Sequence, residues 1–237
     1  MYPIHLNDFK VIDFLSIKPQ LLFSERKDTK FIFHRAELQS IVDSLVNDYL
    51  LVLHYGKYSQ TYSTIYYDSP DLKFYLAHHN GHGNRMKMRT RTYENGSTFF
   101  EVKQKTNKGV TLKERYNSPE TKLEGLQPQL EVVYERITLY DKRLQEKVTV
   151  DFNLQFLDGE RKLGYQDLVI VESKKMKNTQ SLFMDLMKKK KIASVSMSKY
   201  CLGIVSLFDE VKKNNFKKLI HKIQKLNHNY NGISTAC

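Results

Sequence analysis

Basic residues alternate with uncharged ones in one short segment, Arg85 to Thr92, which reads Arg-Met-Lys-Met-Arg-Thr-Arg-Thr. Successive side chains of a β-strand point to opposite faces of a sheet, so the four cations of this segment share one face. A face with that much like charge cannot be packed into an apolar core. The fold must therefore leave it to solvent or to an anionic ligand. Taken alone, the segment also fits a solvated sheet edge or a nucleic-acid platform.

Neighbouring segments narrow this choice. The same alternation returns in Glu101-Lys103-Lys105, Thr111-Lys113-Arg115 and Glu172-Lys174. We predict an α+β fold in which about eight antiparallel strands close into a β-barrel, with the charged faces inward and helices on the flanks. Crowded like charges are costly unless counter-charges enter. The interior should therefore form a basic tunnel that holds water and a polyanion, with glutamate available for a divalent metal.

Periodicity along the chain predicts the individual elements. Strands are expected at 23–33, 61–67, 84–93, 97–105, 111–116, 131–140, 148–156 and 166–174. Helices are expected within 7–22, where a short helix ends before Pro19, and at 36–50, 71–79, 181–190, 199–211 and 215–226. The stretch 118–129 is expected to be a loop or a broken helix. The apolar stripe of the last helix favours packing against the barrel over lying on a membrane. The run Lys188 to Lys191 is expected to be a solvated helix end that could widen the attractive field.

Composition bounds the class of protein. The formal net charge of +12 indicates an anionic partner, which could be nucleic acid, polyphosphate, nucleotide or an anionic membrane. The cysteines, Cys201 and Cys237, are too few for a disulfide framework, which favours a reducing cytoplasm. The N-terminus lacks an apolar core of signal-peptide length, and no apolar run is long enough to span a membrane, so we expect a soluble protein. One domain over 1–237 is expected, with a helical lead-in (1–22), a barrel (23–203) and a helical extension (204–237).

Five short segments carry a resemblance to a known family. They are Arg26-Lys-Asp-Thr-Lys-Phe, Tyr66-Tyr-Asp-Ser-Pro-Asp-Leu-Lys-Phe-Tyr, Arg85-Met-Lys-Met-Arg-Thr-Arg-Thr-Tyr, Glu101-Val-Lys and Ser198-Lys-Tyr-Cys-Leu-Gly. Over about 26–203 the chain resembles the VTC polyphosphate polymerase domain, a branch of the triphosphate tunnel (CYTH-like) metalloenzymes. The resemblance implies a tunnel that binds ATP or another triphosphate, and transfer of the γ-phosphoryl group to polyphosphate or pyrophosphate with Mn²⁺ or Mg²⁺. It implies no specific nucleic-acid partner and leaves the oligomeric state open.

The resemblance also implies roles for individual residues. Catalytic phosphate contacts fall on Arg89, Arg91, Lys103, Lys113, Arg136 and Lys199. Further substrate-binding roles fall on Lys30, Arg85, Lys87, Lys147 and Lys174. The metal role falls on Glu172, with Glu101 as an additional candidate. Two positions depart from the family pattern: Lys147 stands where the family often has Arg, and Ser196 stands where a second cation is expected near Lys199.

Other interpretations stay open. A tunnel triphosphatase would use the same fold and release phosphate, and a non-enzymatic polyanion-binding module would need neither the metal nor the reaction. A nucleic-acid reader would interleave aromatic residues with the basic ones, and Met86, Met88, Thr90 and Thr92 do not fit that pattern. As single residues, Glu101 and Glu172 could equally pair with Lys103 and Lys174. His78, His79 and His82 lie near Gly81 and Gly83, and we expect an exposed loop there rather than a zinc site.

Overall fold

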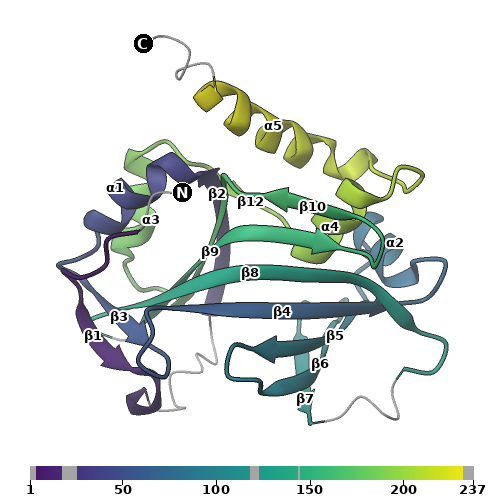
Figure 1. The fold of residues 1–237 in the computed structure, drawn as a ribbon, viewed down its shortest axis with the longest axis horizontal. Helices are drawn as coiled ribbons and strands as arrows, with labels where there is room; N and C mark the ends of the chain where they lie inside the picture. Colours follow the sequence, from purple (N-terminus) through teal and green to yellow (C-terminus); the bar gives the residue numbers. More distant parts are fainter. Residues whose placement is uncertain (1–3, 18–25, 118–122, 144, 232–237) are drawn as a thin grey trace.

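A twelve-stranded sheet dominates the computed structural model, which describes residues 4–17, 26–117, 123–143 and 145–231 (Figure 1). The strands are β1 (Lys10–Asp13), β2 (Arg26–His34), β3 (Tyr49–Leu53), β4 (Ser59–Asp68), β5 (Arg85–Tyr93), β6 (Thr98–Lys105), β7 (Thr111–Tyr116), β8 (Gln127–Asp141), β9 (Glu146–Leu157), β10 (Lys162–Tyr165), β11 (Leu168–Met176) and β12 (Ser194–Val195). The α-helices are α1 (Leu38–Asp43), α2 (Lys73–His79), α3 (Leu182–Lys189), α4 (Lys199–Leu207) and α5 (Lys217–Asn231).

The sheet is open, so the predicted closed barrel of about eight strands is wrong. Its strands follow the order β12-β2-β11-β9-β8-β4-β5-β6-β7, and within the described residues no hydrogen-bonded pairing joins β7 to β12. The neighbouring strands are antiparallel except for β1 and β3, which run parallel. Alternation of charge along a strand indicates which side chains share a face of the sheet. Closure of a barrel also requires the first and last strands to pair, and the alternation does not predict that pairing.

The predicted strands are confirmed as strands, although 23–25 of the first one lies outside the described residues. Four further short strands, which the patterns did not show, are β1, β3, β10 and β12. The predicted helix over 7–22 is wrong where the structure describes it, because Lys10–Asp13 pairs with β3 and Phe14–Ser16 forms a 3₁₀ turn; 18–22 lies outside the described residues. The predicted helix over 36–50 ends at Asp43, and Tyr49 already begins β3. Of the stretch 118–129, residues 118–122 lie outside the described residues and Gln127 begins β8.

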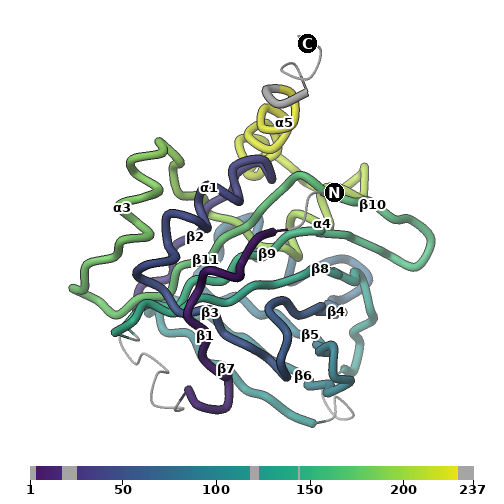
Figure 2. The backbone as a smooth tube through the Cα atoms, turned by 60° about the vertical axis from the view of Figure 1, so that its left-hand side comes forward, coloured from purple at the N-terminus to yellow at the C-terminus, as the bar shows by residue number. Residues whose placement is uncertain are grey.

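Two hydrophobic cores lie on opposite faces of the sheet. We call the face that carries Arg89 the inner face and the other the outer face. Alternation along β2 places Phe31 and Phe33 in the outer core, whereas Ile32 belongs to the inner core. Helices α1 and α3 cover the outer core through residues such as Ile41 and Phe183. Figure 2 shows these two helices on one side of the sheet and α4 with α5 on another.

Helix α4 covers one end of the inner face and leaves the rest of it to charged residues. Its Tyr200 is buried and stacks on Tyr66 of β4 at 5.1 Å between ring centroids. Its Gly203 faces Leu130 and Phe156 so closely that an added Cβ would lie 2.4 Å and 2.6 Å from their side-chain carbons. Only a residue without a side chain permits this approach. The segment Ser198 to Gly203, one of the five that carry the resemblance, therefore also has a role in packing.

Helix α5 packs its apolar side against the inner core, as predicted. Phe216, just before the helix, and Ile223 within it are both buried there, with Leu219, Ile220 and Leu226 alongside. Within the described residues, no helix combines the length and the apolar character needed to cross a membrane.

Candidate functional site on the inner face of the sheet

Strand register brings the predicted cations of β5, β6 and β7 into rows. Lys87 lies opposite Lys103, which lies opposite Lys113. One step along, Glu101 lies between Arg89 and Arg115. Directly opposed residues of antiparallel strands share a face, so both rows belong to the inner face. Arg85 ends the cationic side of β5, opposite Lys105.

A second set of charged residues comes from β2, β11, β9 and β8. Lys30 lies opposite Glu172, Lys147 lies opposite Lys174, and Arg136 lies opposite Asp151. Lys199, the first residue of α4, joins this set from above the sheet. The predicted site residues therefore all lie on the inner face or at its border with α4.

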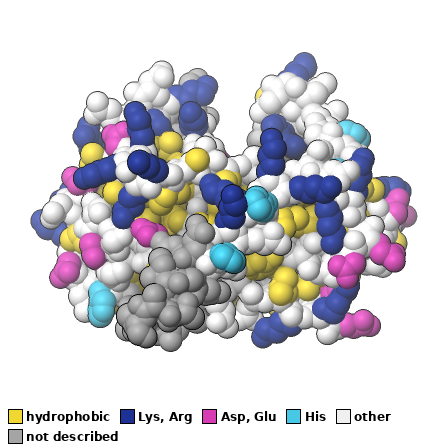
Figure 3. All heavy atoms as spheres, turned by 90° about the horizontal axis from the view of Figure 1, so that it is seen from above, with side chains coloured by type: hydrophobic (Ala, Val, Ile, Leu, Met, Phe, Trp, Pro, Cys, Tyr) yellow, Lys and Arg dark blue, Asp and Glu magenta, His cyan; other side chains and the backbone are white. Residues whose placement is uncertain are grey.

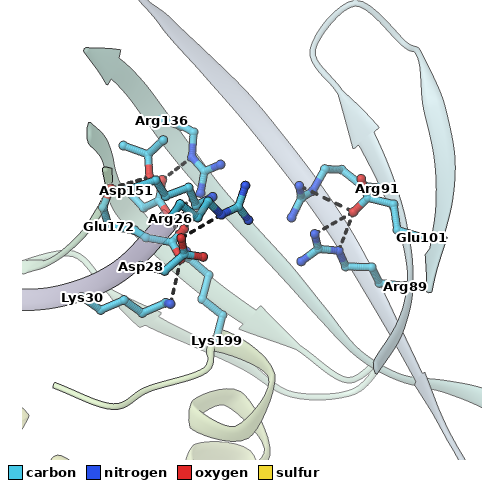
Figure 4. Close-up of polar contacts among 12 residues, drawn as sticks. Arg26, Asp28, Lys30, Arg89, Arg91, Glu101, Arg136, Asp151, Glu172 and Lys199 are labelled. Carbon is cyan, nitrogen blue, oxygen red and sulfur yellow. Dashed lines mark hydrogen bonds and ion pairs between the residues drawn. The ribbon is translucent and has the colours of Figure 1, made fainter. Parts of the chain in front are cut away.

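The sheet curves until the two sets face each other. In a flat sheet the strand spacings between β2 and β7 would separate their side chains by ~34 Å. Yet burial and, next in size, the charge of Arg26 on β2 lower the pKa of Lys113 on β7, an effect that screening confines to about 10 Å. Figure 4 shows the arginines around Glu101 on one side and the cluster around Glu172 and Asp151 on the other.

Glu101 is enclosed by arginines. Its Oε2 accepts hydrogen bonds from Arg89 at 2.6 and 2.7 Å, and its Oε1 accepts one from Arg115 at 2.7 Å. Arg91 lies 3.7 Å away. Burial would raise the pKa of the Glu101 carboxyl, but the charges of Arg89 and Arg91 outweigh it and lower the pKa to about 2. The carboxylate thus orients guanidinium groups, and the alternative pairing with Lys103 is not formed.

Asp151 plays the same part on the opposite side, and sequence reasoning missed it. Arg136 donates to both of its oxygens, at 2.5 and 2.7 Å, and Lys199 forms an ion pair with Oδ2. Only 2% of Asp151 is exposed. Burial would raise its pKa, but Arg136 and then Lys199 lower it to about 2. Asp151 shares the parity of Lys147 and lies between the apolar residues Val150 and Phe152, which was the available signal.

Glu172 forms the third carboxylate centre. Lys30 Nζ lies 2.8 Å from Oε1, and Lys174 Nζ lies 3.0 Å from Oε2, so the expected pairing with Lys174 is present. Burial would raise the pKa of Glu172, but Lys174 and Lys30 hold it well below its ordinary value. Over the described parts of the chain, no three His, Cys, Asp or Glu side chains gather as a metal site. Any metal ion here would take one protein carboxylate and complete its shell with other oxygens.

Several lysines of the inner face have no acidic partner within salt-bridge distance among the described residues: Lys87, Lys103, Lys113 and Lys147. Burial, followed by the charge of Lys174, lowers the pKa of Lys147 to about 7. Burial also lowers the pKa values of Lys87 and Lys103 to about 8, with repulsion between the two lysines contributing to the shift of Lys87. Lys87 donates to Ser198 Oγ at 2.7 Å. These lowered pKa values reflect burial of the ammonium groups and, after it, repulsion between neighbouring cations that lack an anionic partner.

Further residues support this surface without having been predicted. Arg26 pairs with Asp28 at 2.9 Å. The phenol of Tyr66 accepts a hydrogen bond from Arg89 at 3.3 Å, and the ammonium group of Lys199 lies 4.4 Å from the ring centroid of Tyr134. Tyr66 and Tyr134 thus lie beside cations of the inner face, and a pattern of alternating charge does not reveal aromatic partners of this kind.

Of the three histidines near Gly81, His82 lies in the exposed loop that was expected, whereas His78 and His79 lie in α2. His79 is 3% exposed, and its Nε2 accepts a hydrogen bond from the backbone N–H of Asn215 at 3.2 Å. His78 lies near the basic ends of β5 and β6, where burial and then the charge of Lys87 lower its pKa to about 3. Both residues lie at the end of α2, so the histidines help to seat that helix.

The arrangement is suited to hold a chain of negative charges. Fixed guanidinium groups and unneutralised lysines line both sides of one curved face, and guanidinium pairs with phosphoryl oxygens in bidentate fashion. The geometry favours positioning and charge neutralisation over covalent catalysis.

A family model described as the VTC domain matches residues 25–126 and 121–208, well over half of the chain. No curated protein matches the chain. A solved structure, the PH1012 protein from Pyrococcus horikoshii OT3, is similar with a TM-score of 0.43 and 10% sequence identity, over 74% of this chain and 99% of that one.

Proposed function

The chain belongs to the VTC domain family of polyphosphate polymerase domains, and from this premise we propose that it transfers the γ-phosphoryl group of ATP to a growing polyphosphate chain on its inner face. The observation that carries the proposal is the row of unneutralised lysines, Lys87, Lys103 and Lys113, beside arginines already oriented by Glu101. Such a surface lacks negative charge, and a triphosphate supplies it in a linear form.

The inner face has two parts in this mechanism, one for the nucleotide and one for the accepting chain. Arg89, Arg91, Lys103 and Lys113 hold the triphosphate of the nucleotide. Lys30, Arg136, Lys147 and Lys199, which face them across the curved sheet, guide the accepting chain. Arg85, Lys87 and Lys174 add charge at the borders of the two parts.

The reaction needs no side-chain nucleophile. A terminal oxygen of the accepting chain forms a bond to the γ-phosphorus as the bond from that phosphorus to the β,γ-bridging oxygen breaks, and ADP carries away the electron pair. The chain becomes one phosphoryl unit longer. Phosphoryl transfer depends mainly on alignment and on charge neutralisation, which Arg89 and Arg91 supply here from oriented positions.

A divalent ion fits this site only together with substrate. Glu172 offers one carboxylate, and Mg²⁺ commonly binds through one or two carboxylates plus phosphate oxygens and water. Glu172 would hold Mn²⁺ or Mg²⁺, and a bound ion would neutralise charge on the phosphoryl oxygens. Lys30 and Lys174 pair with the oxygens of Glu172 in the free protein, so a bound ion would displace at least one of these ammonium groups. Glu101 is held by the guanidinium groups of Arg89 and Arg115, which the triphosphate needs in place, and no metal is assigned to it.

The open sheet supports a second candidate, hydrolysis of inorganic or nucleoside triphosphate. A polymerase must keep water from the γ-phosphorus. In the part of the chain that the structure describes, β7 and β12 are not paired with each other, which leaves the inner face less enclosed than a closed barrel would. Water would then replace the terminal oxygen of the chain as the nucleophile, and orthophosphate would be the product.

One experiment separates the candidates. The purified protein is incubated with ATP and Mn²⁺, with and without pyrophosphate, and polymer is resolved by electrophoresis while ADP and free phosphate are assayed. Polymer with ADP, lost in Arg89→Ala and Glu172→Ala but kept in the exposed control Lys162→Ala, is the expected result. Free phosphate without polymer would establish hydrolysis instead, and the absence of both products would contradict either reaction.

A further inference from the structure

Two open cavities lie on opposite sides of β12, the short strand at one edge of the sheet. In this strand Val195 pairs with Lys30 and Ser194 pairs with Phe31, and Ser194 lines both cavities. The inner cavity, about 410 Å³, is lined by residues that include Lys27, Lys30 and Ser196. The outer cavity, about 340 Å³, is lined in part by Phe31 and Ser194. Because β12 spans two residues, a single narrow ridge separates the cavities.

The outer cavity combines an apolar lining, which includes Phe31, Met184, Met187 and Ile192, with positive charge from lysines. Lys188 and Lys191 line it, and no acidic residue does so among the described residues. Lys222 of α5 donates to the carbonyl of Ala193, another lining residue, at 3.0 Å. Figure 3 shows Lys and Arg side chains on both sides of a hollow between two lobes of the molecule.

The inner cavity is continuous with the candidate site. Lys30 lines the cavity and also pairs with Glu172 on the inner face. Asp28 is the one acidic residue among the described lining residues, and Arg26 pairs with it. Ser196 stands in this cavity where a cation was expected, so the cavity can accept a chain at this point without a bulky side chain in its way.

We propose that these cavities form one edge groove, lined by Lys27, Lys30, Ser194, Ser196, Lys188 and Lys191, that binds the part of a long polyphosphate chain extending beyond the inner face. This inference rests on the proposed function and adds to it a path by which the chain passes around β12 to the end of α3. Lys188 and Lys191 then act on long chains alone, because a triphosphate held at Arg89 and Lys103 on the opposite set of strands does not extend that far.

Affinity as a function of chain length tests the groove. Binding of inorganic triphosphate and of long-chain polyphosphate is measured for the unchanged protein, for Lys188→Glu/Lys191→Glu, and for Lys162→Glu/Lys217→Glu, a control with the same charge change at exposed positions away from the groove. The groove variant should lose about tenfold in affinity for the long chain and less than about twofold for triphosphate, with a shallower salt dependence for the long chain. The control should lose less than about threefold for both.

Three outcomes would overturn the inference. Equal losses of long-chain affinity in the groove variant and the control would show that the loss reflects net charge alone. An unchanged long-chain affinity in Lys188→Glu/Lys191→Glu would remove the groove. A long chain that binds the unchanged protein no more tightly than triphosphate would overturn the groove and leave the triphosphate site standing, whereas failure of triphosphate itself to bind would overturn the proposed function.

Discussion

Three carboxylates of the inner face, those of Glu101, Asp151 and Glu172, each hold at least two cations. Glu101 orients Arg89 and Arg115, and Asp151 fixes Arg136 with Lys199. Removing one partner of the buried pair Arg136–Asp151 costs about 3–5 kcal/mol because it leaves an uncompensated charge. The arginines are therefore fixed before any ligand arrives, whereas Lys103 and Lys147 are left unneutralised. At the scale of single residues the site contains two classes of cation: arginines held in place, and lysines in need of an anion.

The unneutralised lysines predict proton uptake when triphosphate binds. In the free protein the pKa values are about 7 for Lys147 and about 8 for Lys87 and Lys103. A bound polyanion raises them toward the ordinary lysine value, so at pH 8 binding should take up roughly one to two protons. Affinity should accordingly fall as the pH rises from about 7 toward 10. The ligand-free protein should gain stability over the same range, because its unfolded state binds more protons there.

Titration calorimetry in two buffers of different ionisation enthalpy measures this uptake. Lys147→Met should reduce the number of protons by up to about one, while Lys162→Met, at an exposed position on β10, should leave it unchanged. A binding enthalpy that is the same in both buffers would contradict the lowered pKa values.

Among the elements, α4 connects the site to the inner core. Ser198 caps its first turn by accepting from the N–H of Cys201 and also accepts from Lys87 of β5. Tyr200 donates to Asp68 at 2.5 Å, and Asp68 in turn accepts from backbone N–H groups at the start of α2. The helix thus sets the height of Lys199 above the sheet while it fastens α2 and β4 together.

Gly203 is predicted to be the most sensitive position of α4. Alanine normally stabilises a helix by up to about 1 kcal/mol relative to glycine, but here its Cβ would meet Leu130 and Phe156 at 2.4 and 2.6 Å. Gly203→Ala should therefore destabilise the protein by about 1–3 kcal/mol. Urea unfolding provides the measurement, with Gln224→Ala at an exposed position of α5 as a helical control that should be neutral or stabilising. A stabilised Gly203→Ala would show that the helix packs less closely on β8 and β9.

For the molecule as a whole, the curvature of the sheet brings positive charge from distant strands together. The chain carries a net charge of +12, and burial with mutual repulsion already lowers several lysine pKa values on the inner face. Self-repulsion of this kind opposes the compact state until a counter-ion binds. Ligand binding and folding stability should therefore be strongly coupled.

Inorganic triphosphate is expected to raise the melting temperature. At a ligand concentration of about 100 times Kd the linkage amounts to about 2.7 kcal/mol, which corresponds to roughly 5–11 °C for a chain of this size. Differential scanning fluorimetry at constant ionic strength measures the shift, with sodium chloride as the control. Arg89→Ala should reduce the shift, and an equal shift with chloride alone would count against a specific anion site.

Much of the secondary structure and the cationic faces of β5, β6 and β7 could be predicted from local pattern, whereas Lys30, Arg136, Lys147 and Lys199 were indicated only by the family resemblance. Arg85 to Thr92 predicted a strand with one cationic face, and β5 has that form. Register then places Lys87, Lys103 and Lys113 in one row, as alternation on three strands suggested. The parts that failed are those where the pattern is short or ambiguous. Tyr49–Leu53 continues an apolar run that also suits a helix, and β12 is too short to show any period.

The sequence by itself determined which side chains share a face, because a β-strand alternates with a period of two residues whatever surrounds it. It also determined the sign of the partner through its net charge. Only the tertiary structure decided that the sheet stays open, that Asp151 holds Arg136, and that Glu101 serves arginines rather than Lys103. These outcomes depend on pairing and curvature between strands far apart in the chain, and local periodicity carries no record of such long-range contacts.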